Sequence, residues 1–196
     1  MTVTSAAILL FLVMDPLGNV PFFISALRKV PPVRQRRVIL RELVIALAAL
    51  LLFMFLGRYA MAALGLTEPA LGIAGGVVLA VIALRMIFPS REHSLEEEIG
   101  AEPFIVPLAI PYVAGPSSMA MVMLLMSREP QRWLDWLLAI LLAWGASAPI
   151  ILAGARLRGV MGERGLIAVE RLMGLVLVTI AVQMLLTGLS SYLGKG

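Results

Sequence analysis

Two short stretches of the sequence place proline, glycine and polar side chains inside apolar surroundings. One is Asp15-Pro16-Leu17-Gly18-Asn19-Val20-Pro21, and the other runs from Pro111 to Gly115-Pro116-Ser117-Ser118. Proline cannot donate a backbone hydrogen bond and glycine permits unusual backbone angles, so both stretches should break a helix. A helix that begins at such a break presents N–H groups, which favour an anion such as a carboxylate. A helix that ends there presents carbonyl groups, which favour an ammonium group, Na⁺ or a proton.

A solute that carries both charges matches both kinds of helix end. We expect Asn19 to cap the half-helix after the first break, and Gly115 or Ser117 to cap the half-helix after the second. Asp15 adds a carboxylate that could exchange a proton or act as a fixed charge. The simplest matching solute is a small zwitterionic amino acid, and its predicted binding residues are Asp15, Pro16, Gly18, Asn19, Pro21, Gly115, Pro116, Ser117 and Ser118.

The same residues also admit a purely structural interpretation. The breaks could be kinks that help helices pack, with Asp15 as a capping residue only. Arg85 could pair with Asp15 or extend to the membrane surface, and Gln183 should hydrogen-bond across helices. An ionisable group at membrane depth favours a functional role. We therefore name Asp15, Arg85 and Gln183 as the coupling or supporting groups.

The elements that carry these stretches are membrane spans. The chain has 196 residues, of which 61% are hydrophobic and only 14% charged, whereas a soluble domain carries roughly a quarter charged residues. The apolar runs are long and lack the alternation of a membrane β-barrel. They predict six transmembrane helices and leave no room for a large extramembrane domain. The predicted spans are Thr2–Leu27, Glu42–Leu64, Leu71–Phe88, Phe104–Met126, Trp133–Leu152 and Leu166–Leu189.

The second half of the chain repeats the first. Gly76–Met86 aligns without gaps on Gly174–Met184, and Pro16 falls opposite Pro116. Because each repeat has three spans, the second copy must cross the membrane in the opposite direction. We predict an all-α membrane protein of six transmembrane helices, in which helices 1 and 4 are broken. Residues 1–88 and 104–196 form two inverted three-helix repeats, joined by an acidic cytoplasmic loop at 89–103.

The basic residues predict the orientation in the membrane. Most of the 16 lysines and arginines fall on one face of the predicted topology, and that face should be cytoplasmic. Both termini then lie outside the cytoplasm. The surplus of positive charge is thereby explained by topology, and we expect a lipid bilayer, not a nucleic acid, as the partner. The basic residues on the opposite face are only Arg58, Arg128, Arg132 and Lys195.

Three stretches together resemble the signatures of the MarC family of prokaryotic integral membrane proteins. They are the first break from Asp15 to Phe23, the stretch Pro107–Pro111 with Ala114-Gly115-Pro116, and Arg171–Leu175 with Ile180–Met184. The likeness covers essentially the whole chain. It implies transport of small neutral amino acids such as glycine and alanine across the prokaryotic cytoplasmic membrane, driven by a cation gradient. Ser117-Ser118 depart from the family pattern, which commonly has glycine and a small residue there.

Other classes of function fit the residues less well. The chain has no cysteine, its one histidine lies outside the predicted spans, and Asp15 is the one aspartate at membrane depth that we identify. We therefore expect no enzyme activity, no metal site and no cofactor beyond H⁺ or Na⁺ as a coupling ion. The alternatives that stay open are a small-solute channel and a membrane scaffold or regulator that transports nothing.

Overall fold

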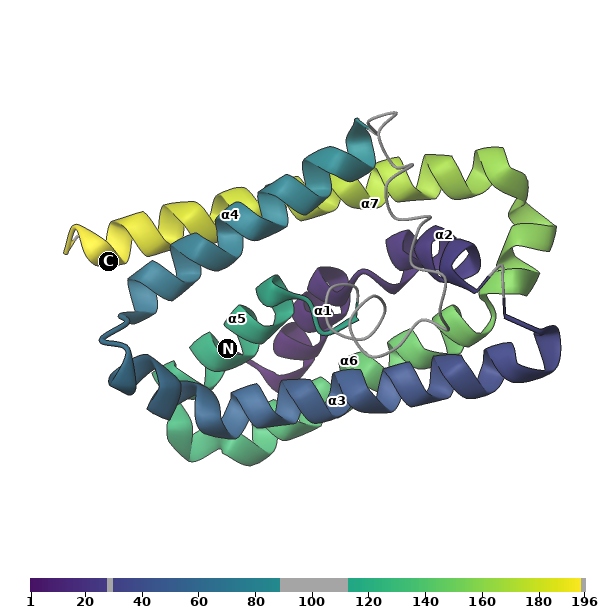
Figure 1. Ribbon diagram of the computed structural model, residues 1–196. Helices are drawn as coiled ribbons and strands as arrows, with labels where there is room; N and C mark the ends of the chain where they lie inside the picture. The colour runs from purple at the N-terminus through teal and green to yellow at the C-terminus, as the bar shows by residue number, and fades with distance from the viewer. Residues whose placement is uncertain (28–29, 89–112, 195–196) are drawn as a thin grey trace.

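The computed structural model describes residues 1–27, 30–88 and 113–194, and these residues form helices and no strands (Figure 1). Each helix is separated from the next by a short connection or by residues outside the described ranges. The helices are α1 (Val3–Met14), α2 (Pro16–Ala26), α3 (Pro32–Ala63), α4 (Glu68–Ile87), α5 (Pro116–Arg128), α6 (Trp133–Leu152) and α7 (Gly154–Tyr192), with a short 3₁₀ helix at Pro130–Arg132.

Five of the predicted spans are present as helical segments long and apolar enough to cross a membrane. They are Val3–Pro21, Val33–Ala63, Glu68–Ile87, Pro130–Leu152 and Arg164–Tyr192. The prediction of an all-α, multi-pass membrane protein is confirmed. For the predicted span at Phe104–Met126, the structure describes only the second part, α5, and residues 104–112 lie outside the described residues, as does the acidic loop at 89–103.

Two helices are longer than the predicted spans. We expected the second span to begin at Glu42, but α3 begins at Pro32, and Pro32 occupies a first-turn position that suits its fixed backbone angle. The sixth span was expected at Leu166–Leu189. α7 runs from Gly154 to Tyr192, but its backbone is non-helical at Gly162 (φ 66°, ψ 176°), and the segment that could cross a membrane, Arg164–Tyr192, lies close to the expected span. The prediction for the second span was too short because hydropathy measures the hydrocarbon thickness, whereas a helix can continue into the interface beyond it.

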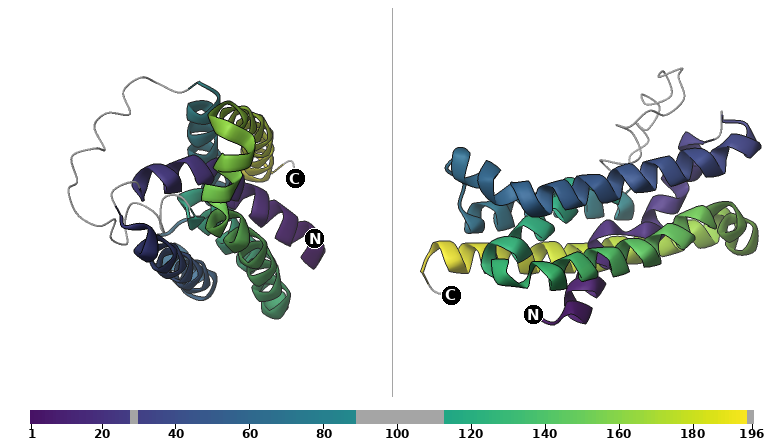
Figure 2. Two further views of the ribbon diagram at one scale, coloured as in Figure 1. Left: turned by 90° about the vertical axis from the view of Figure 1, so that its right-hand side faces the viewer. Right: turned by 90° about the horizontal axis from the view of Figure 1, so that it is seen from below.

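The long helices enclose the short ones (Figures 1 and 2). In the view of Figure 1, α4 lies beside α7 and α3 beside α6, and the half-helices α1, α2 and α5 lie between these two pairs. α1 and α2 pack against α6 and α7, whereas α5 packs against α3 and α4. The helices of the two halves of the chain are thus interleaved, and each half supports the broken span of the other.

The contact between α4 and α7 contains the same arrangement twice. A methyl group added at Gly76 would lie 3.0 Å from the carbonyl oxygen of Ala181, and one added at Gly174 would lie 3.0 Å from that of Ala83. Gly174 lies 98 residues after Gly76, and Ala181 lies 98 residues after Ala83. Glycine at both positions lets the two helix backbones approach closely, as small residues do in membrane helix pairs.

Replacing either of these glycines by alanine should therefore loosen the α4–α7 contact. The added methyl group meets a helix carbonyl, which cannot move aside as a flexible side chain would, so we expect Gly76→Ala and Gly174→Ala each to lower the free energy of unfolding by about 1–3 kcal/mol. The measurement is thermal unfolding in detergent. Gly145→Ala is the matched control, because Gly145 is exposed within α6 and a methyl group there meets nothing within 4 Å. Equal stability of all three variants would contradict this account.

An ion-pair network holds the N-terminus against the α5–α6 connection. Arg132 donates hydrogen bonds to the Met1 carbonyl at 2.7 Å and to the carboxylates of Glu129 and Asp135, each at 2.8 Å. The hydrogen bond from Arg132 lowers the pKa of Glu129 below its usual range. The C-terminal end of α7 and the α3–α4 connection lie at this same end of the molecule (Figure 1). Both chain termini thus share one end.

Candidate functional site

The first break lies at Asp15, between α1 and α2. Asp15 has left-handed backbone angles (φ 42°, ψ 61°), and its N–H donates to the carbonyls of Phe11 and Leu12, both at 3.1 Å. Pro16 cannot donate to the Leu12 carbonyl, and this tight turn supplies the partner instead. Oδ1 of Asp15 accepts the N–H of Gly18 at 3.1 Å. Asp15 is therefore both the C-cap of α1 and the N-cap of α2, and aspartate tolerates the left-handed conformation better than most residues do.

Asn19 has a different role from the one we predicted. α2 begins at Pro16, so Asn19 lies inside the helix and does not cap it. Pro16 is well suited to the first position, because its missing N–H would have had no helical acceptor there. The buried Asn19 amide donates to the carbonyl of Met14 at 2.8 Å, which provides a partner for a group expected to be bare at the end of α1. Asn19 thus ties the two half-helices together.

Gly18 is required by the close packing at the first break. A methyl group at this position would collide with Oδ2 of Asp15 and with the terminal methyl group of Met86 in α4. Oδ2 itself makes no hydrogen bond with the described residues, although Asp15 as a whole is only 5% exposed. Oδ1 of Asp15 thus accepts a hydrogen bond within the protein, and Oδ2 is available to accept one from a ligand.

The second break opens α5 at Pro116, with Gly115 as its N-cap. The backbone angles of Gly115 (φ −65°, ψ 164°) are ordinary extended values, so the unusual angle expected there is absent and belongs to Asp15 instead. The first hydrogen bond within α5 runs from Met119 to the carbonyl of Gly115 at 3.0 Å. The N–H groups of Ser117 and Ser118 precede it and have no acceptor inside the helix.

The two serines differ in their hydrogen bonding. The hydroxyl of Ser118 donates to the carbonyl of Gly115 at 2.9 Å. The hydroxyl of Ser117 makes no hydrogen bond with any residue in the described ranges, although Ser117 is only 2% exposed. A buried hydroxyl group normally has a partner. Ser117 therefore presents an unused polar group at the N-terminus of α5.

The two breaks lie at the inner ends of neighbouring half-helices. The outer ends of α1 and α5 are joined through Met1 and Glu129, whose charged groups are 3.7 Å apart. From that end α1 has 12 residues and α5 has 13, so the two half-helices are of similar length, about 18–20 Å. The two helices also contact each other, near the centre of the molecule in Figure 1. The structure thus brings Asp15 and Ser117 to the inner ends of neighbouring half-helices.

The two half-helices that begin at the breaks differ in the residue that caps their N-terminus. α2 and α5 both begin with a proline, at positions 100 residues apart. The N-terminus of α2 is capped by the carboxylate of Asp15, whereas Gly115 offers α5 no side chain. The positive end of α5 therefore lacks a negative partner from its own cap, and a helix N-terminus of this kind favours an external anion.

Comparison with known proteins agrees with this architecture. The sequence model of the "MarC family integral membrane protein" matches residues 1–193. The chain belongs to the MarC family. A UPF0056 inner membrane protein of Escherichia coli K12, YhgN, is 46% identical over 192 residues, which cover 97% of this chain and 98% of the relative. No solved structure matches the chain.

More distant relatives also match over nearly their whole length. The UPF0056 membrane protein BU449 of Buchnera aphidicola from Acyrthosiphon pisum is 42% identical, with 97% of each chain covered. A UPF0056 membrane protein of Chlamydia pneumoniae is 31% identical over 94% of this chain and 92% of the relative. This chain is accordingly an integral membrane protein.

The two supporting residues that we predicted lie away from the breaks. Arg85 is exposed in the last turn of α4, and no ion pair joins it to Asp15, in agreement with a side chain that extends to the membrane surface. Gln183 is exposed on α7 and donates to Thr187 of the same helix at 3.1 Å. The prediction that Gln183 bonds across helices is therefore wrong. The i, i+4 spacing of Gln183 and Thr187 places them as neighbours on one helix face.

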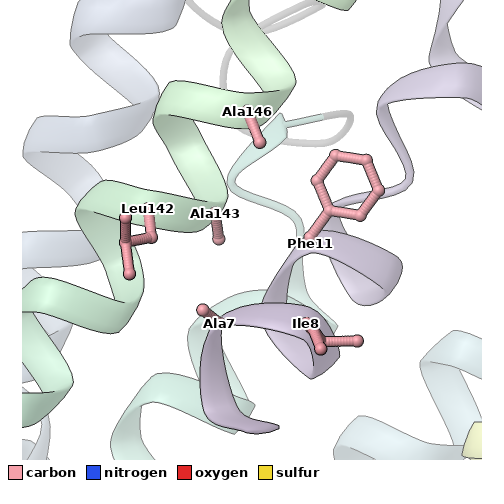
Figure 3. Close-up of a pocket in the computed structure, with 6 residues that line it drawn as sticks. All are labelled: Ala7, Ile8, Phe11, Leu142, Ala143 and Ala146. Carbon is pink, nitrogen blue, oxygen red and sulfur yellow. The ribbon is translucent and has the colours of Figure 1, made fainter. Parts of the chain in front are cut away.

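A surface groove between α1 and α6 offers a different environment. It has a volume of about 200 Å³ and is lined by Ala7, Ile8, Phe11, Leu142, Ala143 and Ala146 (Figure 3). All six side chains are apolar, and Ile8 is 56% exposed. Such a surface suits lipid chains, but it has no group that could orient a zwitterion. The polar residues of the two breaks, by contrast, offer both a carboxylate and hydrogen-bond donors.

One buried charged residue of this MarC family member was missed as a site residue. Glu42 is 0% exposed and lies on the face of α3 that also carries the buried Ile39, Leu43 and Ala46. We had treated Glu42 only as the predicted start of a span. The signal was its spacing, because residues three or four positions apart share one face of a helix and all its neighbours on this face are apolar.

Proposed function

We propose that this protein is a secondary transporter of small neutral amino acids, such as glycine and alanine, across the prokaryotic cytoplasmic membrane. In this proposal the solute binds between the two helix breaks. Its ammonium group faces the Asp15 carboxylate, and its carboxylate faces Ser117 and the N-terminus of α5. Pro16, Gly18, Asn19, Pro21, Gly115, Pro116 and Ser118 shape the two breaks around it, and a proton or sodium gradient drives accumulation.

The observation that carries the proposal is the N-terminus of α5, which has no side-chain cap, beside the hydroxyl of the buried Ser117, which has no hydrogen-bond partner among the described residues. Ser117 is 2% exposed, and Gly115 supplies no capping side chain. A carboxylate is the group that such a helix end favours. Oδ2 of Asp15, at the inner end of the neighbouring half-helix α1, provides the opposite charge. Only a solute with both charges matches both groups.

Alternating access is supported by the relation between the two halves of the chain. Gly76 and Gly174 each lie close to a carbonyl oxygen of the other helix. The residues of one contact are related to those of the other by the same shift of 98 positions. The helix pairings between the halves also match, since the contact of α2 with α6 corresponds to that of α5 with α3, and the contact of α2 with α7 corresponds to that of α5 with α4. We propose on this basis that residues 1–88 and 104–196 are inverted repeats, which can rock against each other around a central site.

Counterflow in proteoliposomes tests the proposal. Vesicles loaded with unlabelled glycine should take up labelled glycine from outside, with an initial rate that saturates as external glycine rises. Vesicles without protein are the control. A rate that never saturates would favour a channel, and a purified, folded protein that moves no amino acid would favour a scaffold or regulator. Either result would overturn the transporter proposal.

The proposed orientation makes a separate prediction. The end of the molecule that holds both termini should face away from the cytoplasm, because most basic residues lie towards the other end. A reporter that works only in the cytoplasm should therefore be inactive when fused to Gly196. The same reporter inserted in the acidic loop at 89–103 should be active. Activity of the Gly196 fusion would show that the orientation is inverted.

A further inference from the structure

The buried face of α3 is apolar except for one carboxylate. Glu42 is completely buried on a face that also carries the buried Leu43, Ala46, Leu50 and Met54. Burying a charged group away from water is costly unless the group is paired and hydrogen-bonded. A carboxylate in this position therefore indicates a role other than packing.

The two oxygen atoms of Glu42 have different surroundings. Oε1 accepts two hydrogen bonds from Arg41, from Nε at 3.0 Å and from Nη2 at 2.9 Å. Oε2 is buried and has no hydrogen-bond partner among the residues that the structure describes. An ionised carboxylate can accept about four hydrogen bonds. One half of this carboxylate is thus satisfied, and the other half is left for a further group.

Among the described residues, the two helices that pack on α3 bring no other charged group close to Oε2. Those helices are α5 and α6, and the charged residues within their bounds, Arg128 and Asp135, lie at the opposite end of the molecule. The nearby polar side chains of α6 donate their hydrogen bonds to backbone carbonyl groups. Trp144 donates to the carbonyl of Leu43 at 2.8 Å, and Ser147 donates to the carbonyl of Ala143 at 2.8 Å. Arg41 is therefore the one described charged side chain that contacts Glu42.

Glu42 lies at an interface between the two halves of the chain. The hydrogen bond from Trp144 to the next residue, Leu43, joins α3 to α6 across this interface. α3 also packs against α5, whose N-terminus belongs to the proposed solute site. The Arg41 side chain is 37% exposed and so connects Glu42 with the surface. A change of charge at Glu42 would act where the two halves meet.

We propose that Glu42 is the proton-coupling site of the transport cycle, an inference that rests on the proposed function. Oε2 takes up a proton from water on one side of the membrane and forms an O–H bond, which turns the carboxylate into the neutral acid. The O–H bond breaks on the other side, and the proton returns to water. No electrons are transferred. A proton fits because it needs one oxygen atom, whereas a hard metal cation needs several oxygen ligands. Asp15 keeps the role of binding the solute ammonium group.

The variant Glu42→Gln separates coupling from solute movement. In proteoliposomes we expect it to exchange labelled glycine in counterflow at a rate close to wild type. Under an imposed proton gradient, wild type should concentrate glycine, whereas Glu42→Gln should only equalise the concentrations inside and outside. Solute-driven proton movement, followed with a pH-sensitive dye in the vesicles, should also disappear. Glu68→Gln is the matched control, because Glu68 is a half-buried carboxylate in the first turn of α4, at the other end of the molecule.

Carbodiimide labelling of wild-type protein provides a measurement that does not depend on a variant. The reagent modifies membrane-buried carboxyl groups in the protonated form, so the labelled peptide should contain Glu42 and labelling should fall as the pH is raised. Absence of label at Glu42 would overturn the inference. So would proton-driven accumulation by Glu42→Gln, or accumulation that responds only to sodium. Those results leave counterflow intact, whereas absence of counterflow in wild type would overturn the proposed function together with this coupling role.

Discussion

Replacing Asp15 by asparagine is expected to raise the KM for glycine by about 30-fold or more, because one partner of a buried charge pair is lost. Asparagine retains the fold at this position. It accepts the Gly18 N–H as an N-cap about as well as aspartate does, and it tolerates the left-handed angles that Asp15 adopts (φ 42°). The measurement is the concentration dependence of glycine counterflow, with thermal unfolding of the same preparation as the check on folding.

Two further variants show whether the loss is specific to the Asp15 charge. Asp15→Ala removes the cap as well as the charge, so it should also lower the free energy of unfolding by about 1 kcal/mol. Asp135→Asn removes a carboxylate that is bound to Arg132 at the outer end of α6, and its KM should equal that of wild type. A wild-type KM for Asp15→Asn would show that Asp15 only caps α2, which is the structural interpretation of the first break.

Replacing Ser117 by alanine is expected to raise the KM for glycine about tenfold, because a hydrogen bond to a charged carboxylate is lost. The hydroxyl of Ser117 is buried and has no partner in the described part of the chain, so its removal leaves no other protein group unsatisfied. The stability of the folded protein should therefore change little. Counterflow at several glycine concentrations measures KM, and unfolding in detergent measures stability.

Ser118→Ala is the matched control for this prediction. Its hydroxyl donates to the carbonyl of Gly115 at 2.9 Å, so its loss should act on stability. We expect the KM of Ser118→Ala to stay within about twofold of wild type, with a loss of about 1 kcal/mol in the free energy of unfolding. If both serine variants bind glycine normally, the solute carboxylate does not bind at the N-terminus of α5.

The broad fold could be predicted from the sequence because the hydropathy of a span and the helix break at a proline depend only on residues that are close together in the sequence. The predicted span Trp133–Leu152 coincides with α6, and the break at Asp15 falls where Pro16 follows it. Helix ends outside the hydrocarbon carry no such signal. The basic stretch before Glu42 looked like a connection, but it forms the first turns of α3. Packing, not hydropathy, decides where such a helix begins.

The site could be predicted less completely because its details depend on which partner each polar group finds. Asn19 was expected to cap a helix, yet its amide binds the Met14 carbonyl across the break. Ser117 and Ser118 are adjacent and identical in type, and only the structure distinguishes the hydroxyl that is used from the one that is not. Glu42 was missed because its apolar neighbours at helical spacing were interpreted only as part of a span, and the structure shows that this face of α3 is buried.

The central claim is that one solute binds through opposite charges at the two breaks. Its most direct test is competition in glycine counterflow by unlabelled glycine, acetate and methylamine, where the last two carry one charged group each. We predict that glycine competes at its own KM and that acetate and methylamine require about 100-fold higher concentrations, because each lacks one ionic contact. Equal competition by methylamine would show that the N-terminus of α5 contributes nothing to binding. Equal competition by acetate would show that Asp15 contributes nothing to binding. Either result would contradict the account.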